Sequence, residues 1–259
     1  MRKKILTLIL FAIFLQSCFK KKEEKTITQT TSEIKVSDTI QKKEPSVKDV
    51  QYNIEVEKID SIQFYSAETK AGNRQEKITK IENFDEARKL LKGVVEFSEK
   101  DEYGENQAVK KIRFRNGKIF QNENDFDGEF FVAYFPGEDI LLCEGGHTTD
   151  VSFNLKNGLQ TEDTGNPDMI VNSPGKAFRL NGHFGGQECS FYFIQRKINN
   201  EYVKIIQLDK EFEKQTKTWL CIIGKSFWAD EKTLYLTEGS NYTESGVKKR
   251  YFKIRIIEK

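Results

Sequence analysis

The fold class follows from the stretch Ile112-Arg113-Phe114-Arg115-Asn116-Gly117-Lys118-Ile119-Phe120. Apolar and basic side chains alternate around Asn116-Gly117, and this dipeptide between alternating runs is the strongest short-range signal for a β-hairpin. Short apolar runs continue from there to the end of the chain, with turns expected at Asn157-Gly158 and Asn199-Asn200. The predicted strands are Ile112–Arg115, Lys118–Phe120, Phe130–Phe135, Ile140–Cys143, Val151–Leu155, Phe178–Leu180, Phe191–Ile194, Tyr202–Leu208, Trp219–Ile223, Leu234–Leu236 and Tyr251–Ile256.

Many short strands with turn signals at close intervals predict a mainly β domain. Three segments within it resemble one another, each a tight turn that leads into a strand: residues 135–142, 173–180 and 229–236. Pro136-Gly137 and Pro174-Gly175 fit the middle of a type II turn, where glycine takes the positive φ. The repeat resembles the turn-and-strand part of β-propeller blades, although its spacing is irregular. We therefore expect either an antiparallel meander or sandwich, or a set of partial propeller-like blades.

One short helix is expected at residues 84–92. Asn83 and Glu86 have the spacing of a capping box, in which the side chain of the first residue and that of the fourth bond each other's backbone N–H. Apolar residues recur at helical spacing after Asn83, and Gly93 suits the left-handed conformation that ends many helices. The helix falls within residues 51–107, ahead of the stretch in which strand signals dominate.

The N-terminus has the form of a secretory signal. Three basic residues, Arg2, Lys3 and Lys4, precede the apolar run Ile5–Leu15, which is broken only by Thr7. A charged start followed by about 7–15 apolar residues is typical of a signal peptide. A membrane-spanning helix needs about 20 apolar residues, so this run is too short to cross a bilayer.

Leu15, Ser17 and Cys18 resemble the lipobox of bacterial lipoproteins, although Gln16 departs from the small or apolar residue usual at its position. The resemblance implies that residues 1–17 are removed and that Cys18 carries a diacylglycerol thioether and an acylated amine. This covalent lipid is the only prosthetic group expected. In that family an aspartate after the cysteine marks inner-membrane retention, so Phe19 implies the outer membrane.

The resemblance also bears on which side of the outer membrane the protein faces. Lys22-Glu23-Glu24 resembles a surface-export signal, so the protein is expected to face either the periplasm or the cell surface. Residues 18–50 are rich in charged and hydroxyl side chains and lack a clustered apolar face. This composition predicts a disordered tether. Residues 51–259 are then expected to form a single β-rich globular domain.

The charges are nearly balanced, with 42 basic and 40 acidic residues in the whole chain. Three of the basic residues belong to the signal peptide, so the processed protein is close to neutral. A nucleic-acid-binding protein would concentrate basic residues on one face. No such concentration is evident in the sequence, and we expect no nucleic-acid partner.

Three cysteines remain after Cys18. Export permits disulfides, so one bridge and one free thiol are possible by any of three pairings. Cys143 ends an apolar run, and Cys221 lies inside Trp219–Ile223. Unpaired cysteine is among the most buried residue types, which favours Cys143 and Cys221 as small core residues and leaves Cys189 undecided.

The two histidines lie in glycine-rich segments, Glu144–Asp150 and Asn181–Cys189. One hypothesis joins these segments into a site, in which imidazole and carboxylate bind a divalent metal or a histidine acts as general base. Its metal ligands would be Glu144, His147, His183 and Glu188, and its catalytic residues would be His147, Asp150 and His183. In the alternative, the segments are tight connections whose histidine and aspartate bond local backbone. The spacing matches no known zinc motif.

Three functions remain open. The leading interpretation is a lipid-anchored envelope protein, without enzymatic activity, whose domain binds an envelope protein or a glycan. The second is an envelope hydrolase or metal-dependent enzyme centred on His147 and His183. The third is an accessory lipoprotein that binds glycan or peptide on an aromatic platform of Phe227-Trp228 and Tyr192-Phe193, residues that fit an ordinary core equally well.

Overall fold

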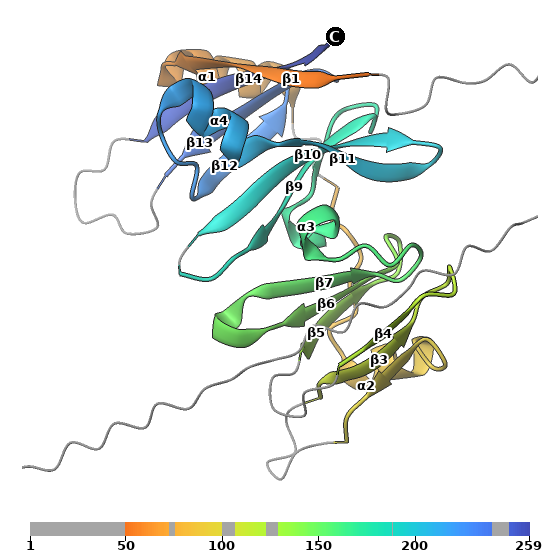
Figure 1. Cartoon of the computed structure of the whole chain (residues 1–259). Coiled ribbons are helices and arrows are strands. Elements are labelled where there is room, and N and C mark those ends of the chain that lie inside the picture. The colour runs from red at the N-terminus through yellow and green to blue at the C-terminus, as the bar shows by residue number, and fades with distance from the viewer. Residues whose placement is uncertain (1–49, 73–75, 100–106, 123–128, 188, 240–248) are drawn as a thin grey trace, which may run out of the picture. The chain divides into compact units, whose positions relative to one another are not determined.

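The computed structural model describes residues 50–72, 76–99, 107–122, 129–187, 189–239 and 249–259 (Figure 1). All of them belong to one compact unit, residues 45–259. The signal peptide, Cys18, Phe19 and the rest of the predicted tether up to residue 49 lie outside the described residues. None of the helices in the described ranges has the length and apolar character needed to cross a membrane.

Four antiparallel sheets make up this unit, which confirms the predicted mainly β fold. The first is β2(Val95–Phe97), β3(Val109–Arg113) and β4(Ile119–Gln121), and the second is β5(Phe130–Phe135), β6(Ile140–Glu144) and β7(Asp150–Asn154). The third is β8(Val171–Asn172), β9(Phe178–Phe184), β10(Ser190–Ile198) and β11(Glu201–Gln207). The fourth is β12(Ile223–Trp228), β13(Thr233–Glu238) and β14(Arg250–Glu258), to which β1(Tyr52–Ile59) adds along β14.

Within each sheet, neighbouring strands follow one another in the sequence. The exception is β1, which pairs with β14 although the two strands lie near opposite ends of the described sequence. The helices in the described ranges are α1(Ser61–Ala71), α2(Phe84–Leu90), α3(Thr161–Thr164) and α4(Leu208–Thr216), with 3-10 turns at Gly146–Thr148 and Pro167–Met169. The predicted helix is α2, and Asn83 caps it by accepting a hydrogen bond from the Glu86 N–H. The other three helices were not predicted.

Two hydrophobic clusters hold the sheets in pairs. One lies between the first and second sheets and includes Ile112, Leu141 and Phe153, with Leu91 after α2. The other lies between the third and fourth sheets and is built on residues such as Ile194, Leu236 and Ile254. Successive side chains of a strand point to opposite faces. A third, smaller cluster therefore occupies the other face of the second sheet, made of Ala133, Phe135, Ile140 and Leu142.

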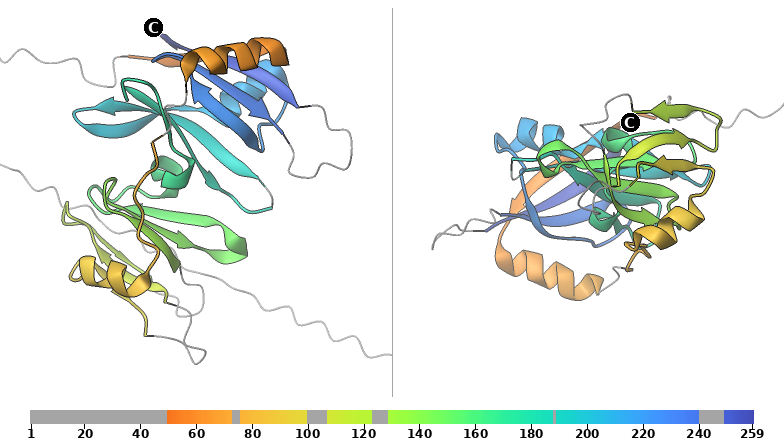
Figure 2. Two further views of the ribbon diagram at one scale, coloured as in Figure 1. Left: turned by 180° about the vertical axis from the view of Figure 1, so that it is seen from behind. Right: turned by 90° about the horizontal axis from the view of Figure 1, so that it is seen from below.

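The fourth sheet is covered on both faces. Figure 2 shows α1 lying across one of them, where the fully buried Phe64 packs against the rings of Phe227, Tyr235 and Tyr251. On the opposite face, Phe212 of α4 packs edge-on against Phe252. Only the two edges of this sheet, along β1 and β12, are left without a strand partner in the described ranges.

The repeated segments are structurally equivalent. Residues 135–142, 173–180 and 229–236 each contain the turn between the first and second strands of their sheet, followed by that second strand. The predicted type II geometry is wrong, however. The positive φ belongs to Asp139 (54°) and Lys176 (58°) and not to the glycines. The left-handed residue therefore lies two positions after Gly137 in the first turn and one position after Gly175 in the second.

Two further expectations are corrected. Trp219–Ile223 is not a strand, because β12 begins only at Ile223 and the preceding residues form a connection from α4. At the hairpin between β3 and β4, Gly117 has a φ of 85° and Asn116 does not have a positive φ. A two-residue type I′ turn would need a positive φ at both residues. Here the Gly117 N–H instead bonds the Phe114 carbonyl, and a single left-handed residue completes the turn.

Candidate functional site

The two glycine-histidine segments lie side by side. Each connects the second and third strands of its sheet: the first runs from β6 to β7 and the second from β9 to β10. A methyl group built on Gly186 would lie 3.1 Å from Thr149 Cγ2 and 3.5 Å from the His147 carbonyl oxygen. The backbones are close enough that a larger residue than glycine would crowd the contact.

Asp150 joins the two segments through hydrogen bonds to its carboxylate. Its Oδ2 accepts from the Phe184 N–H at 2.7 Å and from the Asn166 side-chain amide at 3.0 Å. Both donors are neutral groups. Phe184 belongs to β9 of the third sheet, and Asn166 caps the 3-10 turn that precedes β8 of the same sheet. This carboxylate therefore ties the second sheet to the third, a contact between distant segments and not the local backbone bonding of the alternative interpretation.

His183 lies inside strand β9 and is buried, with 4% of its surface exposed. Its ring packs against Phe191, and its Nε2 lies 3.7 Å from Glu162 Oε1, which is too long for a hydrogen bond. Its Nδ1 is buried without a hydrogen-bond partner. Burial lowers the pKa of His183, and the neighbouring carboxylates of Glu162, Asp150 and Asp209 only partly oppose that shift.

The remaining predicted residues are more open. His147 is exposed and has a left-handed φ of 58°. Glu144 ends β6, is exposed, and lies opposite Asp150 on the neighbouring strand. Glu188 lies outside the described residues. Among the described His, Cys, Asp and Glu side chains, no group of three could hold a metal ion. The metal hypothesis stays a prediction.

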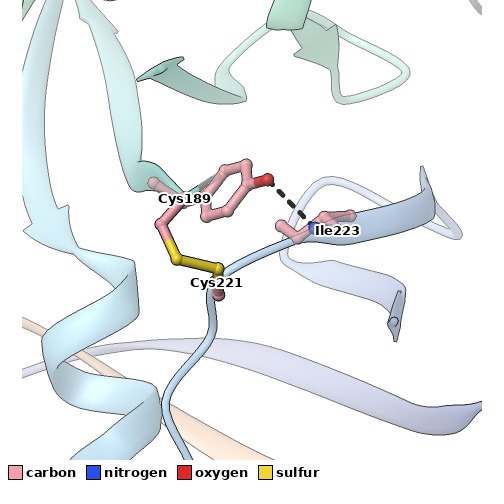
Figure 3. The surroundings of a disulfide bond; sticks show 4 residues. Cys189, Cys221 and Ile223 are labelled. Atoms are coloured by element: carbon pink, nitrogen blue, oxygen red, sulfur yellow. Dashed lines mark hydrogen bonds between the residues drawn. A yellow bond between two sulfur atoms is a disulfide. The ribbon is translucent and has the colours of Figure 1, made fainter. Parts of the chain in front are cut away.

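The cysteines correct one expectation. Cys189 and Cys221 form a disulfide, shown in Figure 3, so Cys221 is not a free core thiol. The bridge joins the start of β10 to the connection that enters β12. Beside it the Ser190 N–H donates to the Cys221 carbonyl, and the Ile223 N–H donates to the Tyr192 hydroxyl at 3.0 Å, the dashed line in Figure 3. The beginning of β12 is thus tied covalently to the third sheet.

Of the three cysteines in the described ranges, Cys143 is free, and it lies in the core as predicted. It is fully buried in the cluster between the first two sheets. Burial raises the pKa of its thiol well above the ordinary value, because a thiolate would lose its hydration there. A thiol in this environment is an inert core group.

A charged network that the sequence did not reveal lies between the second and third sheets. The side chain of Arg179 is 4% exposed, and its guanidinium donates to Glu138 Oε2 at 2.7 Å and to Gln195 Oε1 at 2.6 Å. It also lies 3.8 Å from the centre of the Tyr202 ring. These residues line a cleft of about 320 Å³. A charged residue inside the apolar strand Phe178–Leu180 was the available signal for it.

A larger cleft lies between α1, β8 and the whole of β12. Its volume is about 740 Å³, within the range of ligand-binding clefts. Three aromatic side chains line it: Tyr192, Phe227 and Trp228. All three belong to the aromatic platform suggested by the sequence, whereas Phe193 is fully buried and is not among the lining residues. The sequence did not indicate the residues of α1 and β8 that complete the cleft.

The polar lining of this cleft is mostly paired. Lys225 Nζ lies 2.5 Å from Glu68 Oε1, which ties β12 to α1, and Asp168 pairs with Lys80 at 2.9 Å. Trp228 donates its ring N–H to the Val171 carbonyl at 2.8 Å. By contrast, Asn172 Oδ1 is buried and has no hydrogen-bond partner. Histidine and cysteine are absent from the described lining residues.

Comparison with known proteins does not add to this picture: no protein-family model, curated protein or solved structure matches the chain.

Proposed function

We propose that this chain is a lipid-anchored protein of the bacterial cell envelope, held to the outer membrane by lipid on Cys18. Its domain then binds a ligand in the 740 Å³ cleft between α1, β8 and β12. The ligand is a glycan or a peptide presented in the envelope. The tether of residues 18–50 holds the domain away from the bilayer, so the cleft reaches ligands beyond the lipid headgroups.

The disulfide supports the compartment. Disulfides persist in oxidising environments, among them the bacterial periplasm and the cell surface, and are rare in the cytosol. The Cys189–Cys221 bridge fits that environment, and it lies beside the cleft. The lipobox of the sequence and the disulfide of the structure are independent features, and both favour export.

The cleft itself carries the proposal of a binding function. Its lining is mixed, with three aromatic side chains beside charged and hydroxyl groups, which suits an amphipathic ligand such as a peptide or a glycan. Its charged residues Glu68, Lys225 and Asp168 are held in ion pairs, so they are suited to orienting a ligand. His183, the other candidate centre, is 4% exposed, so a substrate does not reach it without rearrangement.

A pair of substitutions on α1 tests this function. Thr69 is exposed and lines the cleft, whereas Ser66 is exposed on the same helix and does not line it. The lipidated protein in detergent is applied to arrays of linear peptides and of oligosaccharides, together with Thr69→Trp and Ser66→Trp. We expect the protein and Ser66→Trp to retain the same ligands and Thr69→Trp to lose them. Equal retention by Thr69→Trp, or retention of nothing by the unchanged protein, would contradict the proposal.

A further inference from the structure

The cleft runs along the edge of a sheet and not over its face. All six residues of β12, Ile223–Trp228, line it. Since consecutive side chains of a strand point to opposite faces, a cleft over one face would be lined by every second residue only. Phe227 indeed faces α1, whereas Trp228 belongs to the core on the other face. The feature common to all six residues is the free edge of the strand.

The direction of the backbone groups on that edge follows from the ladder. The Ala229 N–H donates to the Thr233 carbonyl of the adjacent strand β13. Backbone groups alternate in direction along an antiparallel strand. The N–H groups of Phe227 and Lys225 therefore point toward β13. The bond from the Lys225 N–H to Thr237 Oγ1 on β13 is consistent with this direction. Those of Ser226 and Trp228 point outward, into the cleft.

The opposite wall is also a sheet edge. β8 is the last strand of the third sheet and pairs only with β9 in the described ranges. β12 is tied to the third sheet at both of its ends. Trp228 Nε1 donates to the Val171 carbonyl of β8, and the Ile223 N–H donates to the Tyr192 hydroxyl of β10, an inner strand.

We propose that the ligand of this cleft is an extended peptide that adds to the fourth sheet as a further strand along β12. An edge strand offers N–H and C=O groups at the two-residue repeat of another strand, and a peptide matches this repeat along its length. The aromatic side chains on both faces of β12 then contact alternate side chains of the peptide. This inference rests on the proposed binding function and specifies its ligand.

A proline at the outward N–H of β12 is the direct test. Proline removes the N–H and is tolerated on edge strands, where the ladder does not use it. The matched control is Lys58→Pro on β1, the other edge of the same sheet. There Val56 donates outward to Gln215, so the exposed Lys58 also points its N–H outward. The probes are linear dodecapeptides selected from a phage-displayed library on the lipidated protein.

Ser226→Pro is expected to weaken peptide binding by at least about tenfold, because one hydrogen bond is lost and the ring blocks the edge. Lys58→Pro is expected to bind within about twofold of the unchanged protein. If Ser226→Pro binds as tightly as Lys58→Pro, the inference is wrong. A melting curve of each variant checks that it folds.

A second measurement needs no protein variant. In the selected peptide, N-methylation of alternate amides removes the donors that face β12, whereas N-methylation of the intervening amides removes those that face away. One set is expected to abolish binding and the other to be tolerated; equal effects of both sets would overturn strand addition. If only oligosaccharides are retained and Thr69→Trp still abolishes their binding, the peptide inference fails while the binding function stands.

Discussion

Replacing both Cys189 and Cys221 by alanine is expected to lower the free energy of unfolding substantially. The two residues are 32 positions apart in the chain. A disulfide stabilises a protein mainly by restricting the unfolded chain, and the loss of loop-closure entropy for a loop of this length corresponds to about 3–4 kcal/mol at room temperature. The midpoint of thermal unfolding should fall by roughly 10 °C, since each kcal/mol shifts it by about 2–4 °C in a domain of this size.

The assay is guanidinium-induced unfolding followed by far-ultraviolet circular dichroism on the lipidated protein, with and without reductant. Reductant should lower the stability of the unchanged protein by the same amount as the double substitution. It should leave the double variant unchanged, because the third cysteine of the domain, Cys143, is a free thiol. Equal stability of the unchanged protein in oxidising and reducing buffer would refute the reasoning, since it would mean that the bridge is not formed or does not restrict the unfolded chain.

Three further predictions concern the anchor, the buried histidine and the buried arginine. Cys18→Ala should release the protein from membranes or leave its signal uncleaved, as cell fractionation and intact mass would show; a processed, membrane-bound variant would contradict the lipobox. Because burial lowers the pKa of His183 in the folded state, the unfolded chain binds more protons below about pH 6.5 and stability should fall as the pH drops from there. His183→Gln should abolish that pH dependence of the unfolding free energy and His147→Gln should preserve it; an unaltered dependence in His183→Gln would assign it elsewhere. Glu138→Ala leaves the Arg179 cation buried without its carboxylate and should cost about 3–5 kcal/mol. Adding Arg179→Met should recover a large part of that loss in the same denaturation assay, and a double variant as unstable as Glu138→Ala would argue against the ion pair.

Features decided by neighbouring residues were predictable. The cap of α2 depends on Asn83 and Glu86, three positions apart, and the structure has the Asn83 cap. α1 carries an equivalent signal, because Asp60 and Gln63 form a complete capping box. Its apolar pattern is weak, however: Ile62 is 79% exposed, and of the residues of α1 only Phe64 and Ala71 are buried. The helix was missed because its stability depends on packing against a sheet built from the far end of the chain.

Features decided by distant contacts were not predictable from local patterns. The apolar run Trp219–Ile223 has the composition of a strand, but Leu220 packs into the core while Trp219 remains 53% exposed and Cys221 is tied to Cys189. The pairing of the cysteines depends on how the third and fourth sheets meet. The cleft has walls from α1, β8 and β12, so only its aromatic residues on β10 and β12 were visible in the sequence.

The central claim is that the outer edge of β12 receives a peptide strand, and amide hydrogen exchange at that edge measures it most directly. The exchange of the Ser226 and Trp228 amides in the lipidated protein is followed with and without a saturating selected peptide. Both amides point away from β13 and should exchange more slowly once they donate to the added strand. The outward amide of Lys58, on the opposite edge, should be unaffected. A bound peptide that leaves the exchange of both Ser226 and Trp228 unchanged would contradict the account.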